Sequence, residues 1–567
     1  MVFLNGARVL RALGGGQWAG LVLALGLGAS VVAEPVEVDT PLRGLEAGGG
    51  SVGTPLVIDH AVVEQLARVG SARIAAFPLE DGVSVDLDLH RIRVLSGDAR
   101  VVVGTDAGDR AIARPDVLLL GGSVVSSTGS TVFLSFFRDG VNGYVEVDGH
   151  THVISSGPSD RPRQPIVYDL TTLPAGVIDF EPFVCHTPAP ADIPWSGRSA
   201  GRSVAPCRVA QVGIDSDWEF TNRLFGGDVD ASAAYALTLV GAISQIYQRD
   251  LNIRMEITFL RVWDTSDDPW TQTDIGRQLT QFRNYWQIFM YDVPRNDAHL
   301  LSGRNLGGGV GELPGLCQGV HGGYALSANL GGFFPYPAVD FDRQNWDPYV
   351  VGHEFGHNFG APHTHEMTPP VDTCASGGCI HDGTIMSYCH LCPGGLRNIR
   401  LGFHERNVNE NILPFLDSLS CDLLAPPVTI TSQPQSVSTC PGLPVTFAVA
   451  AEGEGTLTYQ WRFNGGIIPG ATGTTYTISS ASAFFEGDYD VLVTNGSCEA
   501  ISDPASLSVG AFCTADLTGD CTVDVGDFFA FVAAFSVSDP AADLNGDGSV
   551  DVRDFFAFLI AFQGGCG

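Results

Sequence analysis

The sequence contains no lysine, so all 30 of its basic residues are arginine. Its 63 acidic residues leave a formal net charge of −33, which argues against a nucleic-acid partner. GC-rich codon usage explains the missing lysine more simply than any function does. Beyond the N-terminus, the sequence also lacks an apolar run of the ~20 residues that a membrane span needs. We therefore expect no nucleic-acid partner and no transmembrane anchor in the mature chain.

The N-terminus has the pattern of a secretory signal. Arg8 and Arg11 precede the apolar run WAGLVLALGLGASVVA, which ends with Val31 and Ala33 at the small-residue positions that a signal peptidase recognises. An uncleaved anchor is the alternative, but the run is short and broken by glycine. We predict that residues 1–33 are a signal peptide and that the protein is secreted or associated with the cell surface.

Thirteen cysteines suit an exported protein, because disulfides persist in oxidising compartments. Cys374, Cys379, Cys389 and Cys392 form a cluster that allows three pairings, and the sequence does not choose among them. A structural zinc site is the alternative, but only CHLC at 389–392 has the close spacing it requires. We expect disulfides.

At 567 residues the chain is too long for one hydrophobic core, and its patterning changes several times. Residues 34–203 alternate apolar and polar side chains, as in GVSVDLDLHRIRVL, and end in a linker rich in proline, glycine and serine. Arg198 and Arg202 make that linker a candidate site of proteolysis. Residues 204–424 alternate strand and helix patterns, which predicts an α/β domain.

Residues 427–510 read as a series of short strands that begins after a proline pair. Trp461 lies twelve residues after Val449, and Tyr489 lies two residues before Val491. This segment resembles an immunoglobulin-like β-sandwich with its buried tryptophan and its tyrosine corner, in which the two valines stand at the usual cysteine positions. Such a module implies a spacer or an adhesive unit.

Residues 511–567 contain two copies of one pattern, ADLTGDCTVDVGDFFAF and ADLNGDGSVDVRDFFAF, offset by 27 residues. Acidic residues at loop positions 1, 5 and 12 suit calcium, which takes several oxygen ligands. The candidate calcium ligands are Asp516, Thr518, Asp520 and Asp527 in the first loop and Asp543, Asn545, Asp547 and Asp554 in the second. Two acidic turns without metal are the alternative.

The paired loops, each followed by one helix, resemble small α-helical dockerin or EF-hand-like modules. The resemblance implies up to two structural calcium ions and a cohesin-like or cell-surface docking partner. Two departures weaken it: the twelfth position is Asp instead of Glu, and the sixth is Cys521 in the first loop but Gly548 in the second. The FFAF segments fit either a docking face or the core of a very small domain.

The stretch VVGHEFGHNFGAPHTHEM holds four of the 14 histidines within thirteen positions. On a helix, His353 and His357 share one face, so both can bind one zinc ion. Gly360 allows a sharp turn that returns His363 as a third ligand. Three protein ligands leave a fourth position open, as a catalytic site requires, and Glu354 lies beside the first histidine as a candidate general base.

A second motif supports a catalytic zinc site. GTIMSYC places Met386 in a tight turn 23 residues after His363. Together with HExxHxxGxxH this is the pattern of metzincins, so residues 204–424 resemble a metzincin catalytic domain of the reprolysin type, the group of snake-venom and ADAM-like proteases. The resemblance implies a five-stranded sheet and a substrate that lies antiparallel to an edge strand, for which GGGVGEL at 307–313 is the candidate.

The resemblance also implies roles for two further residues. Tyr388 matches the Met-turn tyrosine of astacins and serralysins, which makes it a candidate transition-state stabiliser or a structural residue. The β-rich segment resembles the propeptide of such proteases, and Cys185 is a candidate cysteine switch that occupies the open zinc position. A disulfide from Cys185, with Cys207 for example, is the alternative.

The sequence therefore predicts a multidomain protein: a β-rich propeptide, an α/β metzincin domain, an Ig-like sandwich and a dockerin-like module. Its expected function is a secreted zinc endopeptidase that cleaves protein or peptide substrates with Glu354 as general base. An extracellular adhesion or scaffold protein with a catalytically silent metzincin domain is the first alternative. A zinc hydrolase of non-peptide amides is the second.

Overall fold

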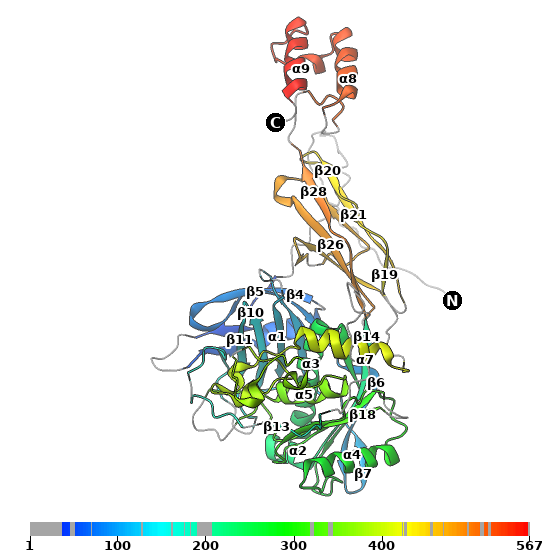
Figure 1. The fold of residues 1–567 in the computed structure, drawn as a ribbon. Coiled ribbons are helices and arrows are strands. Elements are labelled where there is room, and N and C mark those ends of the chain that lie inside the picture. The colour runs from blue at the N-terminus through cyan, green and yellow to red at the C-terminus, as the bar shows by residue number, and fades with distance from the viewer. Residues whose placement is uncertain are drawn as a thin grey trace, which may run out of the picture. The chain divides into compact units, whose positions relative to one another are not determined.

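The computed structural model gives the fold shown in Figure 1. It describes residues 37–564 except 46–51, 70, 126, 128, 160–162, 175, 182, 190–206, 318–321, 338–343, 381, 422, 424–427, 454–456, 469, 496–497, 511–514 and 520–522. The predicted signal peptide, most of the predicted linker and the candidate calcium ligand Asp520 lie outside the described residues.

The N-terminal region forms a ten-stranded sheet in the order β1-β4-β5-β8-β9-β10-β11-β12-β3-β2. Its elements are β1 (Glu37–Val38), β2 (Leu42–Gly44), β3 (Thr54–Ile58), α1 (His60–Arg68), β4 (Ser71–Pro78), β5 (Ser84–Arg91), β8 (Leu118–Val124), β9 (Thr131–Phe137), β10 (Gly140–Val147), β11 (His150–Ser155) and β12 (Ile166–Asp169). Asp148 and Gly149 both have positive φ, 52° and 83°, so they form the tight turn that joins β10 to β11. The predicted β-rich patterning of this region is confirmed.

A second sheet has eight strands and belongs to the domain that contains the histidine motif. Its strand order is β13-β17-β18-β16-β14-β15-β6-β7. Five strands come from residues 208–327: β14 (Arg208–Ser216), β15 (Ile253–Trp263), β16 (Asp297–Leu301), β17 (Gly308–Gly311) and β18 (Gly323–Ser327). Its helices are α2 (Trp218–Phe225), α3 (Val229–Leu251), α4 (Ile275–Phe289), α5 (Asp347–Asn358), α6 (Glu405–Asn407) and α7 (Leu413–Ser418). The predicted strand and helix alternation is confirmed.

Three strands of this sheet come from the N-terminal region, which the sequence does not predict. β6 (Leu95–Thr105) pairs in parallel with β15, and β7 (Gly108–Ala111) pairs antiparallel with β6. At the other edge, β13 (Val184–Cys185) pairs in parallel with β17. An uncovered β15 would present a row of unpaired backbone groups at a sheet edge, and β6 satisfies them. The N-terminal region is thus built into the sheet of the α/β domain at both of its edges.

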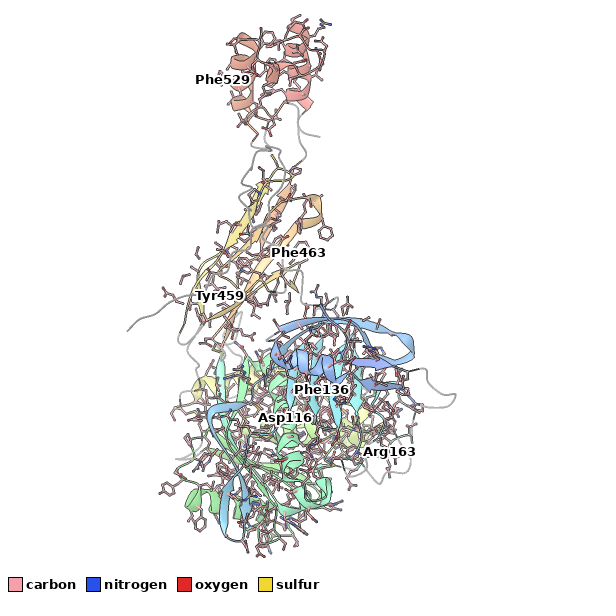
Figure 2. The ribbon with its side chains drawn as sticks, turned by 180° about the vertical axis from the view of Figure 1, so that it is seen from behind. Asp116, Phe136, Arg163, Tyr459, Phe463 and Phe529 are labelled. Carbon is pink, nitrogen blue, oxygen red and sulfur yellow. A yellow bond between two sulfur atoms is a disulfide. The ribbon has the colours of Figure 1, made fainter. Side chains whose placement is uncertain are left out.

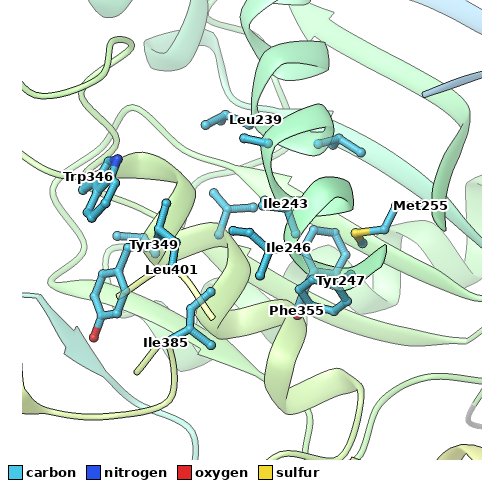
Figure 3. Packing of buried hydrophobic residues seen from close by; sticks show 14 of the residues in the cluster. Leu239, Ile243, Ile246, Tyr247, Met255, Trp346, Tyr349, Phe355, Ile385 and Leu401 are labelled. Carbon is cyan, nitrogen blue, oxygen red and sulfur yellow. The ribbon is translucent and has the colours of Figure 1, made fainter. Parts of the chain in front are cut away.

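The helix α3 joins the two regions through a shared core. Asp228 caps its first turn by accepting a hydrogen bond from the Ala231 N–H at 2.9 Å. Contacts of α3 reach both β15 and the strands β8 and β9, and the Tyr144 hydroxyl donates to the Ala242 carbonyl at 3.1 Å. Figure 3 shows Ile243 and Ile246 of α3 among the buried side chains of α5. By length and composition α3 is apolar enough to span a membrane, but 83% of that window is buried inside the protein, as in a core helix.

Residues 428–509 form the short strands that the sequence predicts. They are β19 (Thr429–Ser432), β20 (Val437–Thr439), β21 (Val445–Ala448), β22 (Ala450–Glu452), β23 (Thr458–Phe463), β24 (Gly466–Ile467), β25 (Thr475–Ile478), β26 (Gly487–Thr494), β27 (Glu499–Ile501) and β28 (Ala505–Val509). Trp461 and Tyr489 are buried, and the Tyr489 hydroxyl donates to the Phe485 carbonyl at 2.8 Å. Val449 and Val491 are buried in the same core. These contacts are those of a tyrosine corner, while the Ig-like assignment itself stays a prediction.

The tail has two helices, α8 (Val525–Ser536) and α9 (Val552–Gly564). Phe531 and Phe558 stack in its core with ring centroids 4.3 Å apart. Phe529, which Figure 2 labels, is 65% exposed, and Phe556 is 59% exposed. The FFAF segments therefore supply both a core and an outward apolar face.

Disulfides join the predicted cysteine cluster. Cys374 pairs with Cys389 and Cys379 with Cys392, so the disulfide prediction is confirmed for these four. Further bonds are Cys317–Cys421 and Cys207–Cys498. Among the cysteines that the structure describes, Cys185 alone has a free thiol, and Cys207 is therefore not its partner.

Candidate metal centre and cleft

The helix α5 begins at Asp347, whose buried carboxylate accepts hydrogen bonds from the Tyr235 hydroxyl at 2.8 Å and the Gly332 N–H at 2.9 Å. Burial raises the pKa of Asp347 to about 7. On this helix His353 and His357 lie four residues apart, and both are fully buried. The spacing places their rings 4.9 Å apart on one face of the helix.

Gly360 ends the helix with a φ of +89°. A Cβ atom there would lie 2.8 Å from the Phe415 ring, so both the backbone and the packing require glycine. The turn returns His363 to the site, with its Nε2 3.2 Å from the Nε2 of His357.

Replacing Gly360 with alanine is expected to destabilise the protein by about 2–3 kcal/mol, because the change adds backbone strain and a clash. Gly377→Ala is the matched control, since Gly377 has a φ of +88° and open space around its Cβ direction. The free energy of unfolding and the bound zinc of both variants measure the difference. Equal losses in the two variants would contradict a packing role for Gly360.

Hydrogen bonds fix the orientation of two of the three imidazoles, and a carboxylate lies close to the third. Nδ1 of His353 lies 2.6 Å from the Ile385 carbonyl, and Nδ1 of His357 lies 2.8 Å from the Ala361 carbonyl. A carbonyl only accepts, so each Nδ1 carries the proton and each Nε2 presents a lone pair. Nδ1 of His363 lies 3.0 Å from the Glu366 carboxylate. The three Nε2 lone pairs therefore converge. Lone pairs that face one another are repulsive unless a cation lies between them, so this arrangement favours a bound metal ion.

Cys185 completes this cluster. Its Sγ lies 3.3 Å from Nε2 of His357, and ligand atoms of Cys185 and the three histidines all lie within 4.8 Å of one another. A tetrahedral zinc site with bonds of ~2.0–2.3 Å places its ligand atoms about 3.3–3.6 Å apart. Nε2 of His353 has no hydrogen-bond partner among the described residues. The donor set and its spacing thus fit one zinc ion held by three histidines and one thiolate.

Glu354 lies next to the cluster with both oxygens buried. Its Oε1 has no hydrogen-bond partner within the described part of the chain, and its Oε2 lies 3.5 Å from the Thr187 hydroxyl and 3.7 Å from the Cys185 thiol. Burial raises the pKa of Glu354 well above its usual range, and burial followed by the charge of Glu354 raises the pKa of the Cys185 thiol. A divalent cation in the cluster would act in the opposite direction on both groups.

Met386 packs against the helix that carries two of the histidines, and Tyr388 packs against the third. A Cβ at Gly356 would lie 2.5 Å from the Met386 sulfur, so the methionine packs directly against α5 one residue before His357. The Tyr388 ring lies 4.7 Å from that of His363, and its hydroxyl donates to the Cys185 carbonyl at 3.1 Å. Both candidate residues therefore lie at the cluster.

The N-terminal segment around Cys185 lies along the predicted edge strand. β13 pairs in parallel with β17, with Cys185 opposite Gly309. The Thr187 hydroxyl accepts from the Gly311 N–H at 2.8 Å. A Cβ at Gly309 would lie 2.2 Å from the Glu354 carboxylate, which accounts for one glycine of the GGGVG run. The segment runs parallel to β17, whereas the family resemblance implies that a substrate runs antiparallel to this strand.

Sequence reasoning missed the residues that hold Cys185 in place. Phe183 is buried beside His353, and the carbonyl of Phe183 accepts from Nε2 of His390 at 2.8 Å. Thr187 and Phe183 each lie two residues from Cys185, so in extended backbone they face the same side. This period-two spacing around Cys185 is the sequence signal that could have identified Phe183 and Thr187. Nothing in the sequence spacing points to His390.

The candidate calcium ligands lie in two loops with matching hydrogen bonds. In the first, the Asp527 carboxylate accepts from the N–H groups of Thr518 and Asp524, each at 2.9 Å. In the second, Asp554 accepts from the N–H groups of Asn545 and Asp551 at 3.1 and 2.9 Å. The described members of the set are Asp516, Thr518 and Asp527 in the first loop and Asp543, Asn545, Asp547 and Asp554 in the second. Among described residues, the groups of His, Cys, Asp and Glu with metal-like spacing all lie outside this tail, at the histidine site and at Asp372.

Comparison with known proteins agrees with this geometry. Residues 206–398 match the family model Reprolysin_5, described as metallo-peptidase family M12. This part of the chain is reprolysin-like, and the family points to peptide hydrolysis with zinc. Mouse disintegrin and metalloproteinase domain-containing protein 19 is 23% identical over 385 residues, 62% of this chain and 39% of its own length.

Three further similarities are short. The decoration protein of Escherichia phage T5 is 41% identical over 73 residues, 12% of this chain and 44% of that protein, so the chain spans less than half the length of each curated relative. Among solved structures, a chimeric titin Z1Z2 tandem is 28% identical, covering 15% of this chain and 50% of its own, with a TM-score of 0.14. Sidekick-1 immunoglobulin domains 1–5 are 18% identical, covering 15% of this chain and 18% of their own, also at 0.14. TM-scores this low support no argument about the fold.

Proposed function

We propose that the protein is a secreted zinc endopeptidase made as a latent precursor. The observation that carries the proposal is the convergence of three histidine Nε2 atoms beside the buried carboxylate of Glu354. His353, His357 and His363 hold the zinc ion. Bound zinc supplies Lewis acidity, which polarises a carbonyl group and makes water acidic near neutral pH.

The chain's own groups carry the proton transfers. Glu354 accepts a proton from the attacking water and delivers it to the departing amine, so no proton is lost overall. In the intact chain Oε2 of Glu354 contacts only the Cys185 thiol and the Thr187 hydroxyl among the described residues, so removal of the covering segment frees this carboxylate for the attacking water. The Tyr388 hydroxyl, released from the Cys185 carbonyl, is placed to donate to the oxyanion.

Latency follows from the same contacts. Cys185 holds the fourth position of the metal cluster, and the parallel pairing of β13 covers the strand where substrate would bind. Removal of this segment exposes both. Cleavage in the linker before residue 204 frees its C-terminal end, and Arg198 and Arg202 in that linker suit a trypsin-like protease.

The tail is proposed to bind up to two calcium ions and to dock on a protein partner through its apolar face. Asp547→Ala is expected to reduce calcium binding from two ions to one, since it removes a ligand from the second loop only. Isothermal calorimetry of the full chain measures the number of ions, and Asp539→Ala, outside the loops, is the control. Unchanged binding in Asp547→Ala would contradict the assignment.

The central proposal is tested on a protein from which the covering segment has been excised. Sites for a specific protease, placed at 174–176 and within 190–203, release the segment with Cys185 and leave the ten-stranded sheet attached through its shared core. We expect this excised protein to cleave internal bonds of a denatured protein, to lose activity with a chelator, and to regain it with zinc. Zinc binding without cleavage of any protein would favour a silent adhesion module.

A further inference from the structure

We infer that residues 37–173 stay bound to the catalytic domain as a second chain of the activated protein, after the covering segment around Cys185 has left the cleft. The family resemblance implies instead that the whole N-terminal region is a removable propeptide. The inference rests on the proposed endopeptidase function and deepens it by naming what remains after activation. The sequence has no cysteine before Cys185, so contacts without a disulfide must hold the two chains together.

The helix α3 shows why separation of the two regions is unfavourable. It has no charged residue between Asp230 and Arg249, and every residue from Ser232 to Tyr247 is buried. A helix that is apolar and buried on all sides needs neighbours on all sides. In this protein β15 and α5 cover one part of α3, and β8 and β9 of the N-terminal sheet cover another. Departure of the N-terminal region would therefore leave an uncharged helix face in water.

Packing between α3 and the N-terminal sheet is as close as in the interior of one domain. A Cβ at Gly241 of α3 would lie 3.0 Å from the Leu119 side chain and 3.1 Å from the Phe133 ring, and both of these side chains are buried. From the other side, a Cβ at Gly121 of β8 would lie 2.3 Å from the Gln245 amide nitrogen. Each surface thus has a glycine where the other approaches, which fits a lasting contact and not a transient one.

Buried polar groups of the two regions are paired with each other. The hydroxyl oxygens of Ser135 on β9 and Thr238 on α3 lie 2.7 Å apart. The Tyr168 hydroxyl on β12 donates to the Pro335 carbonyl at 2.8 Å. Both hydrogen bonds are buried, so neither region leaves these groups without a partner while the two stay together.

The edge of the eight-stranded sheet provides a second, independent contact. A Cβ at Gly104 of β6 would lie 2.5 Å from the Trp263 ring of β15. The buried Arg261 of β15 lies 3.3 Å from the Asp109 carboxylate of β7. The strand β17, where we propose that substrate binds, lies at the other side of the sheet, so β6 and β7 can stay without blocking the cleft. The covering strand β13, by contrast, pairs with β17 at two positions.

Size-exclusion chromatography of the cut chain tests the inference. A chain with protease sites at 174–176 and within 190–203 also has Cys185→Ser, which removes the thiolate that holds the covering segment. The cut protein is run at about 0.1 µM in about 1 M sodium chloride, which screens surface charges but not apolar packing. We expect the N-terminal fragment to elute with residues 204–567 in equal amounts, which requires a Kd below about 10 nM. Elution of the fragment on its own overturns the inference, whatever state the catalytic chain is then in.

Gly241→Val is the variant that weakens the contact, because its branched side chain would meet Leu119 and Phe133. We expect it to weaken retention of the fragment at least about 10-fold, measured as the fraction that co-elutes across a dilution series. Gly276→Val is the matched control, since Gly276 is exposed in the first turn of α4 and only the Asp274 carboxylate lies near its Cβ direction, at 3.6 Å. Equal retention in the two variants would contradict α3 as the surface that holds the fragment.

Peptidase activity of the same fractions separates this inference from the proposed function. Cleavage of a denatured protein by the two-chain complex supports both. A complex that holds together without cleaving removes the endopeptidase function alone, and a catalytic chain that still cleaves after losing the fragment removes the inference alone.

Discussion

Replacing Cys185 with alanine is expected to give the intact, uncleaved chain a peptidase activity at least about 10-fold above that of the unaltered chain. The thiol lies 3.3 Å from Nε2 of His357 and blocks the position through which a substrate must reach the metal. A thiolate is also among the strongest zinc ligands, so its loss removes the main bond that holds the covering segment at the centre. Hydrolysis of a quenched fluorescent peptide measures the change.

Activation by this substitution should remain partial. The backbone pairing of β13 with β17 and the buried Phe183 still hold the segment in the cleft. Val184→Ala is the matched control, because Val184 lies on the same strand and its side chain is 42% exposed. If Cys185→Ala stays as inactive as the Val184 variant, the thiol is not what keeps the chain latent.

Replacing Glu354 with glutamine in the excised protein is expected to lower kcat/KM by about 10²–10⁴-fold while zinc content stays near one per chain. Glutamine keeps the size and burial of the side chain but accepts no proton from water. Steady-state rates and elemental analysis of the same sample provide both numbers. A variant that retains most of its activity would exclude Glu354 as the general base.

Glu366→Gln separates proton transfer from metal binding. Glu366 lies 3.0 Å from Nδ1 of His363 and accepts a hydrogen bond from the His363 N–H at 3.2 Å, so it supports this zinc ligand and not Glu354. Its replacement should weaken zinc affinity by about 10–100-fold and restore activity when zinc is in excess. Zinc should not rescue the Glu354 variant.

Local patterns predicted most of the secondary structure because the elements follow from short-range physics. The helix pattern at 230–251 correctly predicted α3. The helix ends at Asn252, whose φ of +54° is the left-handed conformation that asparagine tolerates at a helix C-terminus. The histidine site was equally local: His353 and His357 share a helix, and Gly360 turns the chain back within three residues.

Contacts between distant segments were not predictable from the sequence. The pairing of β6 with β15 joins strands about 160 residues apart, and an alternating strand carries no mark of which sheet edge it will complete. The hydrogen bond from His390 to Phe183 spans 207 residues. Cys207–Cys498 closes 291 residues, and spacing alone cannot choose such a pair.

The zinc K-edge X-ray absorption spectrum of the intact chain tests the central claim most directly, because it reports the atoms bound to the metal. The account predicts three nitrogen neighbours and one sulfur neighbour, with the sulfur replaced by oxygen after the covering segment is excised. In the Cys185→Ala chain the sulfur signal should be absent from the start. A zinc ion with no sulfur neighbour in the intact chain, or with several, would contradict the assignment of His353, His357, His363 and Cys185 as its ligands.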